Sequence, residues 1–207
     1  MKLFIVRHPQ TEYNAKDITH GSYPEFDDGR ISELGIKQMH GLVSKTKVIG
    51  IDIIISSDLP RCKILAKEIS SELDTEIEYS PKLREKDYGD FTGKKNSEIN
   101  WKVLKGNFED RKPLNGESLE DLKIRTEDFA KSLVEKYGET DKKIVIVSHS
   151  IFIKVFVGNL IGLSLYDSIF KIKVDNCSLI ELKYEKKDGL GEFKLIGLFN
   201  NQDFLDR

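Results

Sequence analysis

Residues 3–14 read LFIVRHPQTEYN, an unbroken apolar run followed at once by an arginine and a histidine. Apolar runs without alternation are typical of strands that are covered on both faces, as in a parallel sheet. Two more runs have this character, Ile53-Ile54-Ile55 and Ile144-Val145-Ile146-Val147. We therefore predict buried parallel strands at these three places.

Helical patterns separate the predicted strands. The helix between the first two should begin after the N-cap Ser32, and the longest one should span residues 117–137 with a capping box of Ser118 and Asp121. The apolar spacing of the first predicted helix comes from Ile36, Met39 and Val43. The apolar stripe after the second strand is formed by Cys62, Leu65, Ala66, Ile69 and Leu73.

The end of the chain predicts an antiparallel hairpin at an edge of the sheet, with strands over residues 174–184 and 193–198 and a polar turn at 186–189. Residues 87–116 mix glycines, lysines and aromatic residues, and we interpret them as an insertion beside the site, with a short helical stretch around 97–104. Together these patterns predict one α/β domain over residues 1–207, a three-layer sandwich with a mainly parallel mixed sheet flanked by helices.

Composition excludes several classes of protein. Lysine and arginine total 33 against 35 aspartates and glutamates, a formal charge of -2 that favours neither a nucleic acid nor an anionic membrane as partner. The apolar runs are too short to cross a bilayer. Cys62 and Cys177 suggest neither a metal set nor a disulfide framework, and with no signal peptide recognised we expect a cytoplasmic protein.

Charged and polar residues follow each of the three predicted strands. Arg7 and His8 follow the first, Arg61 opens the helix after the second, and His149 follows the third. Ligands of α/β sheets gather outside the carboxyl ends of the strands. Two guanidiniums there offer fork-shaped donors to an oxyanion, and helix N-termini add backbone N–H groups, so the pattern points to a phosphate ligand.

An imidazole that faces a phosphoryl group can attack phosphorus, and the leaving oxygen then needs a proton donor. Glu85 is a candidate for that donor. Blander interpretations stay open for each residue alone: a histidine after a strand can be a hydrogen-bonded core residue, Glu85 a solvated surface carboxylate, and Arg7 or Arg61 an ion-pair partner of Asp58 or Asp52.

Metal and nucleotide motifs are missing from the sequence. No H-E-x-x-H or clustered D-x-H spacing points to a zinc or two-metal phosphatase, and no G-x-x-x-x-G-K-[ST] loop points to a nucleotide triphosphate. We expect the two arginines to supply the positive charge that a metal would, and hence no metal and no cofactor.

The stretch Arg7-His8-Pro9-Gln10-Thr11-Glu12-Tyr13-Asn14 resembles the Arg-His-Gly-x-Thr-x-x-Asn hallmark of the histidine phosphatase superfamily, the phosphoglycerate-mutase-like proteins. The resemblance continues in order along nearly the whole chain. Its other segments are ISELGIKQ at 31–38, SSDLPR at 56–61, LREKDYGDFTG at 83–93, GES at 116–118 and VSH at 147–149.

This resemblance implies a phosphoglycerate-mutase-like fold and a role for each matching residue. His8 is the implied nucleophile and Glu85 the implied proton donor. The implied ligands of the phosphoryl oxygens are Arg7, Arg61 and His149. The residues implied to contact or line the substrate pocket are Thr11, Asn14, His20 and Gly21.

Two positions depart from the family pattern. Pro9 and Ser150 both stand where the family usually has glycine. Proline removes a backbone N–H that could help to orient the site. A serine at position 150 is expected to cap the following helix.

We expect a metal-independent phosphomonoesterase that acts on a small phosphorylated metabolite through a phosphohistidine. Lys86-Asp87 in place of the Arg-His pair usual in mutases, and a short tail after Leu198, lean toward hydrolysis. A cofactor-dependent phosphoglycerate mutase is the first alternative, and a phosphate-ligand sensor without catalysis is the second. The sequence names no physiological substrate and leaves the oligomeric state open, with a homodimer among the alternatives.

Overall fold

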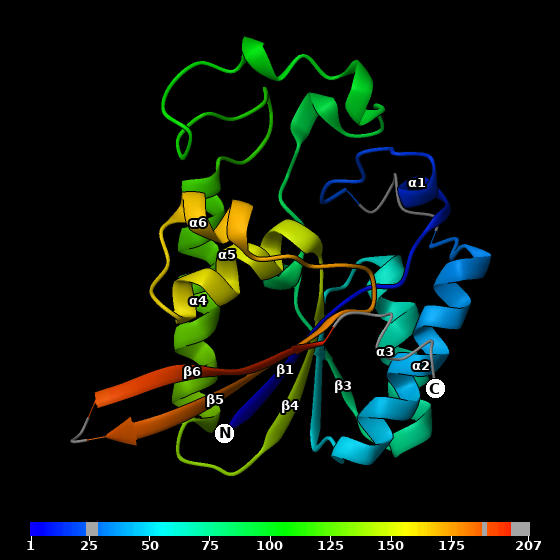
Figure 1. Ribbon diagram of the computed structural model, residues 1–207, viewed down its shortest axis with the longest axis vertical. Coiled ribbons are helices and arrows are strands. Elements are labelled where there is room, and N and C mark those ends of the chain that lie inside the picture. Colours follow the sequence, from blue (N-terminus) through cyan, green and yellow to red (C-terminus); the bar gives the residue numbers. More distant parts are fainter. Residues whose placement is uncertain (24–28, 188–189, 200–207) are drawn as a thin grey trace.

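The computed structural model describes residues 1–23, 29–187 and 190–199, in which a six-stranded mixed sheet forms the middle layer (Figure 1). The strand order is β3-β2-β4-β1-β5-β6. The strands are β1 (Lys2–Arg7), β2 (Ile53–Ser56), β3 (Ile77–Tyr79), β4 (Lys143–Ser148), β5 (Leu179–Lys187) and β6 (Leu190–Phe199). Strands β1 to β4 are parallel to one another, β5 is antiparallel to β1, and β6 is antiparallel to β5, which confirms a mainly parallel mixed sheet.

Helices cover both faces of the sheet (Figure 1). One layer holds α2 (Glu33–Ile49) and α3 (Pro60–Leu73), and the other holds α4 (Leu119–Tyr137), α5 (Ser150–Leu160) and α6 (Leu165–Lys171). Strand β1 shows why two cores result: Leu3 and Ile5 pack into the core on the α4–α5 side, while Phe4 and Val6 pack into the core on the α2–α3 side. Successive strand side chains point to opposite faces, so a doubly covered strand is apolar at every position.

Helix caps agree with the sequence, but one apolar face does not. Ser32 caps α2, and Ser118 caps α4 in a capping box with Asp121, as predicted. Ile36 is 44% exposed, so its assignment to the inner face of α2 is wrong. The buried face of α2 instead begins at Gly35, where an added Cβ would lie 2.1 Å from the carbonyl oxygen of Gln10, and the residue after Gly35 therefore points away from that face.

The C-terminal hairpin is antiparallel and ends the sheet at β6, as predicted. Strand β5 begins at Leu179, five residues later than expected, because residues 174–178 form a loop that contacts the end of β1. Cys177 in that loop has a left-handed φ of 56°. Part of the predicted turn, residues 188–189, lies outside the described residues.

Residues 87–116 run over the end of the sheet at which β1, β2 and β4 finish, the green segment at the top of Figure 1. They contain three short 3-10 helices: η3 (Gly89–Phe91), η4 (Asn96–Glu98) and η5 (Trp101–Val103). The helical stretch predicted at 97–104 is therefore replaced by η4 and η5. The short α1 (Glu12–Ala15) lies at the same end. No helix in the described part of the chain is long and apolar enough to cross a membrane.

Candidate active site

Three adjacent strands end at one place. Arg7 is in register with Ser148, and Ser56 is in register with Val147, so the residues that follow β1, β2 and β4 meet at the same edge. The rings of His8 and His149 lie 5.3 Å apart between centroids. We call Arg7, His8, Arg61 and His149 the His-Arg cluster.

His8 is held in a defined tautomer. Its Nδ1 lies 2.8 Å from the carbonyl oxygen of Pro9, which can only accept, so Nδ1 carries the proton and Nε2 keeps its lone pair. Burial, together with the charges of Arg61 and Arg7, lowers the pKa of His8 well below 6.5. A buried, neutral imidazole with a free nitrogen is a competent nucleophile.

His149 is fully buried, and its two ring nitrogens have different partners. Arg61 donates from Nε to Nδ1 over 3.2 Å, so Nδ1 is the acceptor and Nε2 carries the proton, 2.8 Å from the hydroxyl oxygen of Ser57. Burial and the charge of Arg61 lower the pKa of His149 well below 6.5. The one N–H of the neutral ring is therefore directed at Ser57, and the ring lies beside that of His8.

The two arginines do not form the ion pairs that the sequence left open. Asp58 accepts from Arg84 instead, at 2.7 and 2.6 Å, and Asp52 accepts from the backbone N–H of Lys143 at 2.8 Å. Arg7 ends β1, and Arg61 lies in the first turn of α3, after the end of β2. Arg7 donates from Nη1 to the carbonyl of Val174 at 2.8 Å, and Arg61 donates from Nη2 to the carbonyl of Gly21 at 3.0 Å.

One donor of this cluster has no acceptor. The Nε of Arg7 is buried and makes no hydrogen bond to any described residue. A buried guanidinium N–H without a partner is costly, and a phosphoryl oxygen is a fitting acceptor for it. The site thus contains a buried donor whose hydrogen bond an oxyanion could accept.

Glu85 is not a solvated surface carboxylate, because its residue is only 8% exposed. Its Oε1 accepts from the backbone N–H groups of Lys86 and Phe152, at 2.9 and 3.0 Å, and its Oε2 accepts from that of Ile151 at 3.2 Å. The carboxylate thus binds the first turn of α5, which starts directly after His149. The charge of Glu85 opposes the lowering of the Arg7 pKa by burial, so the two groups share one site.

The four residues predicted to contact substrate lie at α1 and in the segment that follows it. Thr11 and Asn14 make the capping box of α1, with hydrogen bonds of 3.1 and 3.2 Å. The Thr11 hydroxyl also lies 3.1 Å from Nε2 of His20, whose ring is 6.4 Å from that of His8. Gly21 offers its carbonyl to Arg61 and has a φ of 64°. These contacts brace the site, and contact with a substrate stays a prediction.

The departures at Pro9 and Ser150 have different outcomes. Pro9 keeps the one group that the structure uses, its carbonyl, so His8 is oriented despite the missing N–H. The prediction that Ser150 caps the helix is wrong, because His149 occupies the N-cap position and α5 begins at Ser150 itself. The carboxylate of Glu85 accepts the first-turn N–H groups instead.

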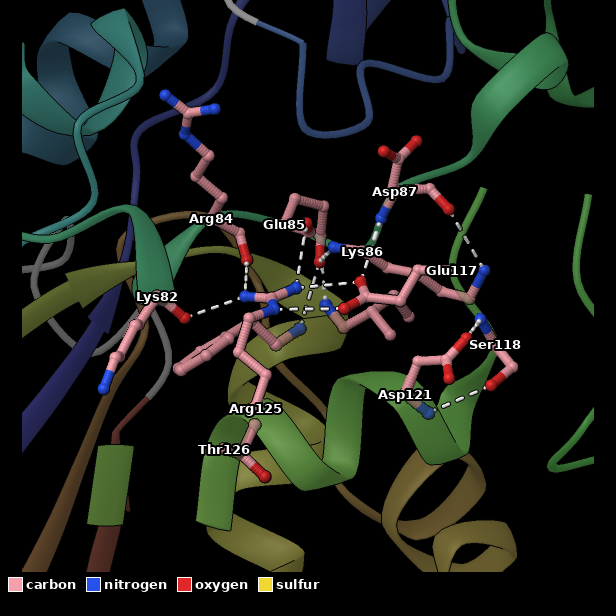
Figure 2. A network of polar contacts seen from close by, with 12 residues as sticks. Lys82, Arg84, Glu85, Lys86, Asp87, Glu117, Ser118, Asp121, Arg125 and Thr126 are labelled. Atoms are coloured by element: carbon pink, nitrogen blue, oxygen red, sulfur yellow. Dashed lines mark hydrogen bonds and ion pairs between the residues drawn. The ribbon is translucent and has the colours of Figure 1, made fainter. Parts of the chain in front are cut away.

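Supporting residues from distant segments escaped the sequence analysis. Asn176 donates from Nδ2 to the carbonyl of His8 at 3.0 Å, and Arg125 on α4 bonds the backbone around Glu85 (Figure 2). Asn176 is 168 residues from His8, and Arg125 lies in an ordinary charged helix, so neither has a local signal. Ser57, the partner of His149, does have a local sequence signal, since it directly follows strand β2.

Comparison with known proteins identifies the family of this chain. The family model of the histidine phosphatase superfamily (branch 1) matches residues 3–194. A protein named probable phosphoglycerate mutase GpmB from Enterobacter sp. (strain 638) is 26% identical over 212 residues, covering 100% of this chain and 95% of that one.

Solved structures share the fold. A phosphoserine phosphatase from Entamoeba histolytica, in complex with 3-phosphoglyceric acid, superposes with a TM-score of 0.82 at 24% identity and covers 99% of both chains. A mycobacterial glucosyl-3-phosphoglycerate phosphatase gives a TM-score of 0.81 at 23% identity, over 95% of this chain and 97% of that one. With the family model spanning nearly its whole length, this chain belongs to the histidine phosphatase superfamily.

Proposed function

We propose that this protein is a metal-independent phosphomonoesterase that hydrolyses a small phosphorylated metabolite through a phosphohistidine at His8. The observation that carries the proposal is the state of His8: neutral, with Nδ1 bound to the Pro9 carbonyl and Nε2 free, beside the unpartnered Nε of Arg7. In the proposed mechanism these two groups act as the nucleophile and an oxyanion donor.

The first half-reaction transfers the phosphoryl group to the enzyme. Nε2 of His8 forms a bond to phosphorus while the bond from phosphorus to the ester oxygen breaks. Arg7, Arg61 and His149 stabilise the charge on the non-bridging oxygens, and protonated Glu85 gives its proton to the departing oxygen. The products are an alcohol and a phosphohistidine.

The second half-reaction returns the enzyme to its first state. Ionised Glu85 takes a proton from water as the water oxygen forms a bond to phosphorus. The bond between phosphorus and Nε2 breaks, so phosphate leaves and His8 is again neutral. Two arginines already provide the cationic cradle in this scheme, so full activity is expected in the presence of EDTA.

A phosphoglycerate mutase is a second candidate, favoured by the names of the curated relatives. It would use the same phosphohistidine but pass the phosphoryl group to a second hydroxyl instead of water. The sequence feature that opposes it is Lys86-Asp87 after Glu85, where mutases usually carry Arg-His.

Parallel assays separate the two candidates. Hydrolysis of p-nitrophenyl phosphate and conversion of 3-phosphoglycerate are measured side by side with EDTA, and the phosphoenzyme is trapped by acid quench from a ³²P-labelled substrate. Efficient hydrolysis with label on His8 supports the phosphatase. Rapid mutase turnover with negligible hydrolysis would replace it by the second candidate, and loss of activity restored by zinc, magnesium or manganese would refute the metal-independent mechanism.

A further inference from the structure

Arg125 reaches from α4 to the backbone that carries Glu85 (Figure 2). Its Nη1 donates to the carbonyls of Lys82 and Arg84, both at 2.8 Å, and its Nη2 lies 3.4 Å from the carbonyl of Glu85. One guanidinium thus binds three carbonyls within four residues. Arginine has the planar fork of donors that this arrangement needs, and lysine does not.

Glu117 fixes the orientation of that guanidinium. It accepts from Nε of Arg125 at 3.0 Å and from Nη2 at 2.8 Å, a two-point ion pair whose side chains are only 16% and 22% exposed. Glu117 also binds the far side of the loop, because it accepts from the N–H of Asp87 at 3.1 Å and donates its own N–H to the Asp87 carbonyl at 2.9 Å. The pair therefore secures the chain on both sides of Glu85.

Arg125 also packs on the helix that binds the carboxylate. Its guanidinium carbon lies 5.6 Å from the ring centroid of Phe152, and the backbone N–H of Phe152 donates to Oε1 of Glu85. The peptide that bears Glu85 and the helix turn that receives its side chain are thus both in contact with one side chain.

We propose that Arg125, oriented by Glu117, is a positioning residue that sets Glu85 at the leaving oxygen. This inference rests on the proposed function, in which Glu85 is the proton donor. A general acid must lie within hydrogen-bond reach of the atom it protonates, and displacement by about 1 Å can cost about 100-fold in rate. The effect falls on protonation of the leaving group and leaves the attack by His8 unchanged.

The test uses two substrates whose leaving groups differ in how much they need to be protonated as they depart. Phenyl phosphate is p-nitrophenyl phosphate without its nitro group, and its leaving group is the more basic of the two. Arg125→Lys keeps the charge but cannot reproduce the five bonds. We expect kcat for phenyl phosphate to fall by about tenfold or more, and kcat for p-nitrophenyl phosphate by less than about threefold.

Arg84→Lys is the matched control. It makes the same replacement beside Glu85 and breaks the two-point pair with Asp58, but the Arg84 side chain holds none of the three carbonyls. The ratio of the two rates is expected to stay at the wild-type value. If Arg84→Lys changes the ratio as much as Arg125→Lys does, any ion pair near Glu85 suffices, and the proposal is wrong.

A double mutant separates positioning from a general loss of stability. In a Glu85→Gln background the proton donor is gone, so adding Arg125→Lys is expected to lower kcat for phenyl phosphate by less than about twofold. A further tenfold fall would overturn the proposal. If Arg125→Lys fails to fold by circular dichroism, Glu117→Gln takes its place, with the same ratio as readout.

The design distinguishes failure of this inference from failure of the proposed function. If Glu85→Gln slows both substrates equally, Glu85 is not the proton donor. The positioning role of Arg125 and the proposed mechanism are then both refuted. If Glu85→Gln selectively slows phenyl phosphate but Arg125→Lys does not, the proposed function stands and the positioning role is refuted.

Discussion

The His-Arg cluster and residues 87–116 lie at the same end of the sheet but are built differently. The cluster follows three adjacent strands, and His8, Arg61 and His149 are buried and hydrogen-bonded to neighbouring segments. Residues 87–116 contain no strand or α-helix, and Val103 and Leu114 are exposed. From this difference we infer that the sheet fixes the positions of the His-Arg cluster. Residues 87–116, which we call the covering segment, can change in sequence without moving that cluster.

The largest effect should come from His8→Ala. We expect the phosphoenzyme to disappear and kcat to fall by at least about 10⁴-fold, since no other described group replaces the Nε2 nucleophile in the proposed mechanism. Acid-quench labelling measures the intermediate, and circular dichroism checks the fold. Wild-type turnover in this variant would mean that the nucleophile is another residue. The His-Arg cluster would then not be the part of the molecule that reacts with phosphorus, in contrast to residues 87–116.

His149→Ala should come next, at about 100- to 1000-fold in kcat, because in the proposed mechanism the Nε2–H of His149, which is bound to Ser57 in the structure, stabilises the charge that develops on the phosphoryl oxygens. The label on His8 should still form, though more slowly. Ser57→Ala is the control: it removes the partner of His149 Nε2 and keeps the ring, so we expect a smaller loss. Equal losses would show that the ring acts only through its orientation by Ser57.

Much of the cluster could be predicted because its signals are local. An apolar strand followed by a charged residue places that residue at a sheet edge, and three such places converge once the strands are parallel. The same logic succeeds for the caps at Ser32 and Ser118, where side chain and backbone partner are three residues apart.

What the sequence did not predict depends on contacts between distant segments. The pattern of residues 174–184 predicts one strand, yet residues 174–178 form a loop in which the Val174 carbonyl accepts from Arg7 and Asn176 donates to the His8 carbonyl. Arg125 resembles any solvated helical cation until α4 is packed beside the Glu85 loop. Such roles exist only after the chain has folded, so no spacing rule reveals them.

The pH dependence should show that the two histidines of the His-Arg cluster are neutral. Since the pKa of His8 lies well below 6.5, NMR titration of its ring should show no protonation near that pH. The unfolded chain does bind protons there, so the free energy of unfolding should decrease as pH falls below about 6.5 and keep decreasing down to the lowered pKa values of His8 and His149. Thermal unfolding of wild type and His149→Gln measures this, with a shallower decrease expected in the variant. A His8 titration at 6.5 or above would contradict a neutral His8.

A smaller effect is expected in the covering segment. Trp101 packs edge-on against Phe91 and Tyr88, with ring centroids 5.5 and 6.1 Å away, but it is 40% exposed. Trp101→Ala should lower the free energy of unfolding by about 1–2 kcal/mol and change kcat for p-nitrophenyl phosphate by less than about threefold. Phe152→Ala in the core is the reference, at about 3–5 kcal/mol. A tenfold fall in kcat for Trp101→Ala would show that the segment helps to organise the cluster.

The smallest effect is expected for Pro9→Gly, although this position adjoins the nucleophile. The structure uses the carbonyl of residue 9 to bind Nδ1 of His8, and glycine retains that carbonyl, so kcat should change by less than about twofold. Glycine gives the unfolded chain more conformations than proline, so the free energy of unfolding should fall by about 0.4–1 kcal/mol. Stopped assays and urea unfolding measure the two quantities, and the Nδ1 proton of His8 can be followed by NMR in both proteins. A rise in kcat above about tenfold would show that the backbone N–H that proline lacks contributes more to catalysis than the carbonyl of residue 9 does. The positions of the strand ends would then not be enough to orient His8.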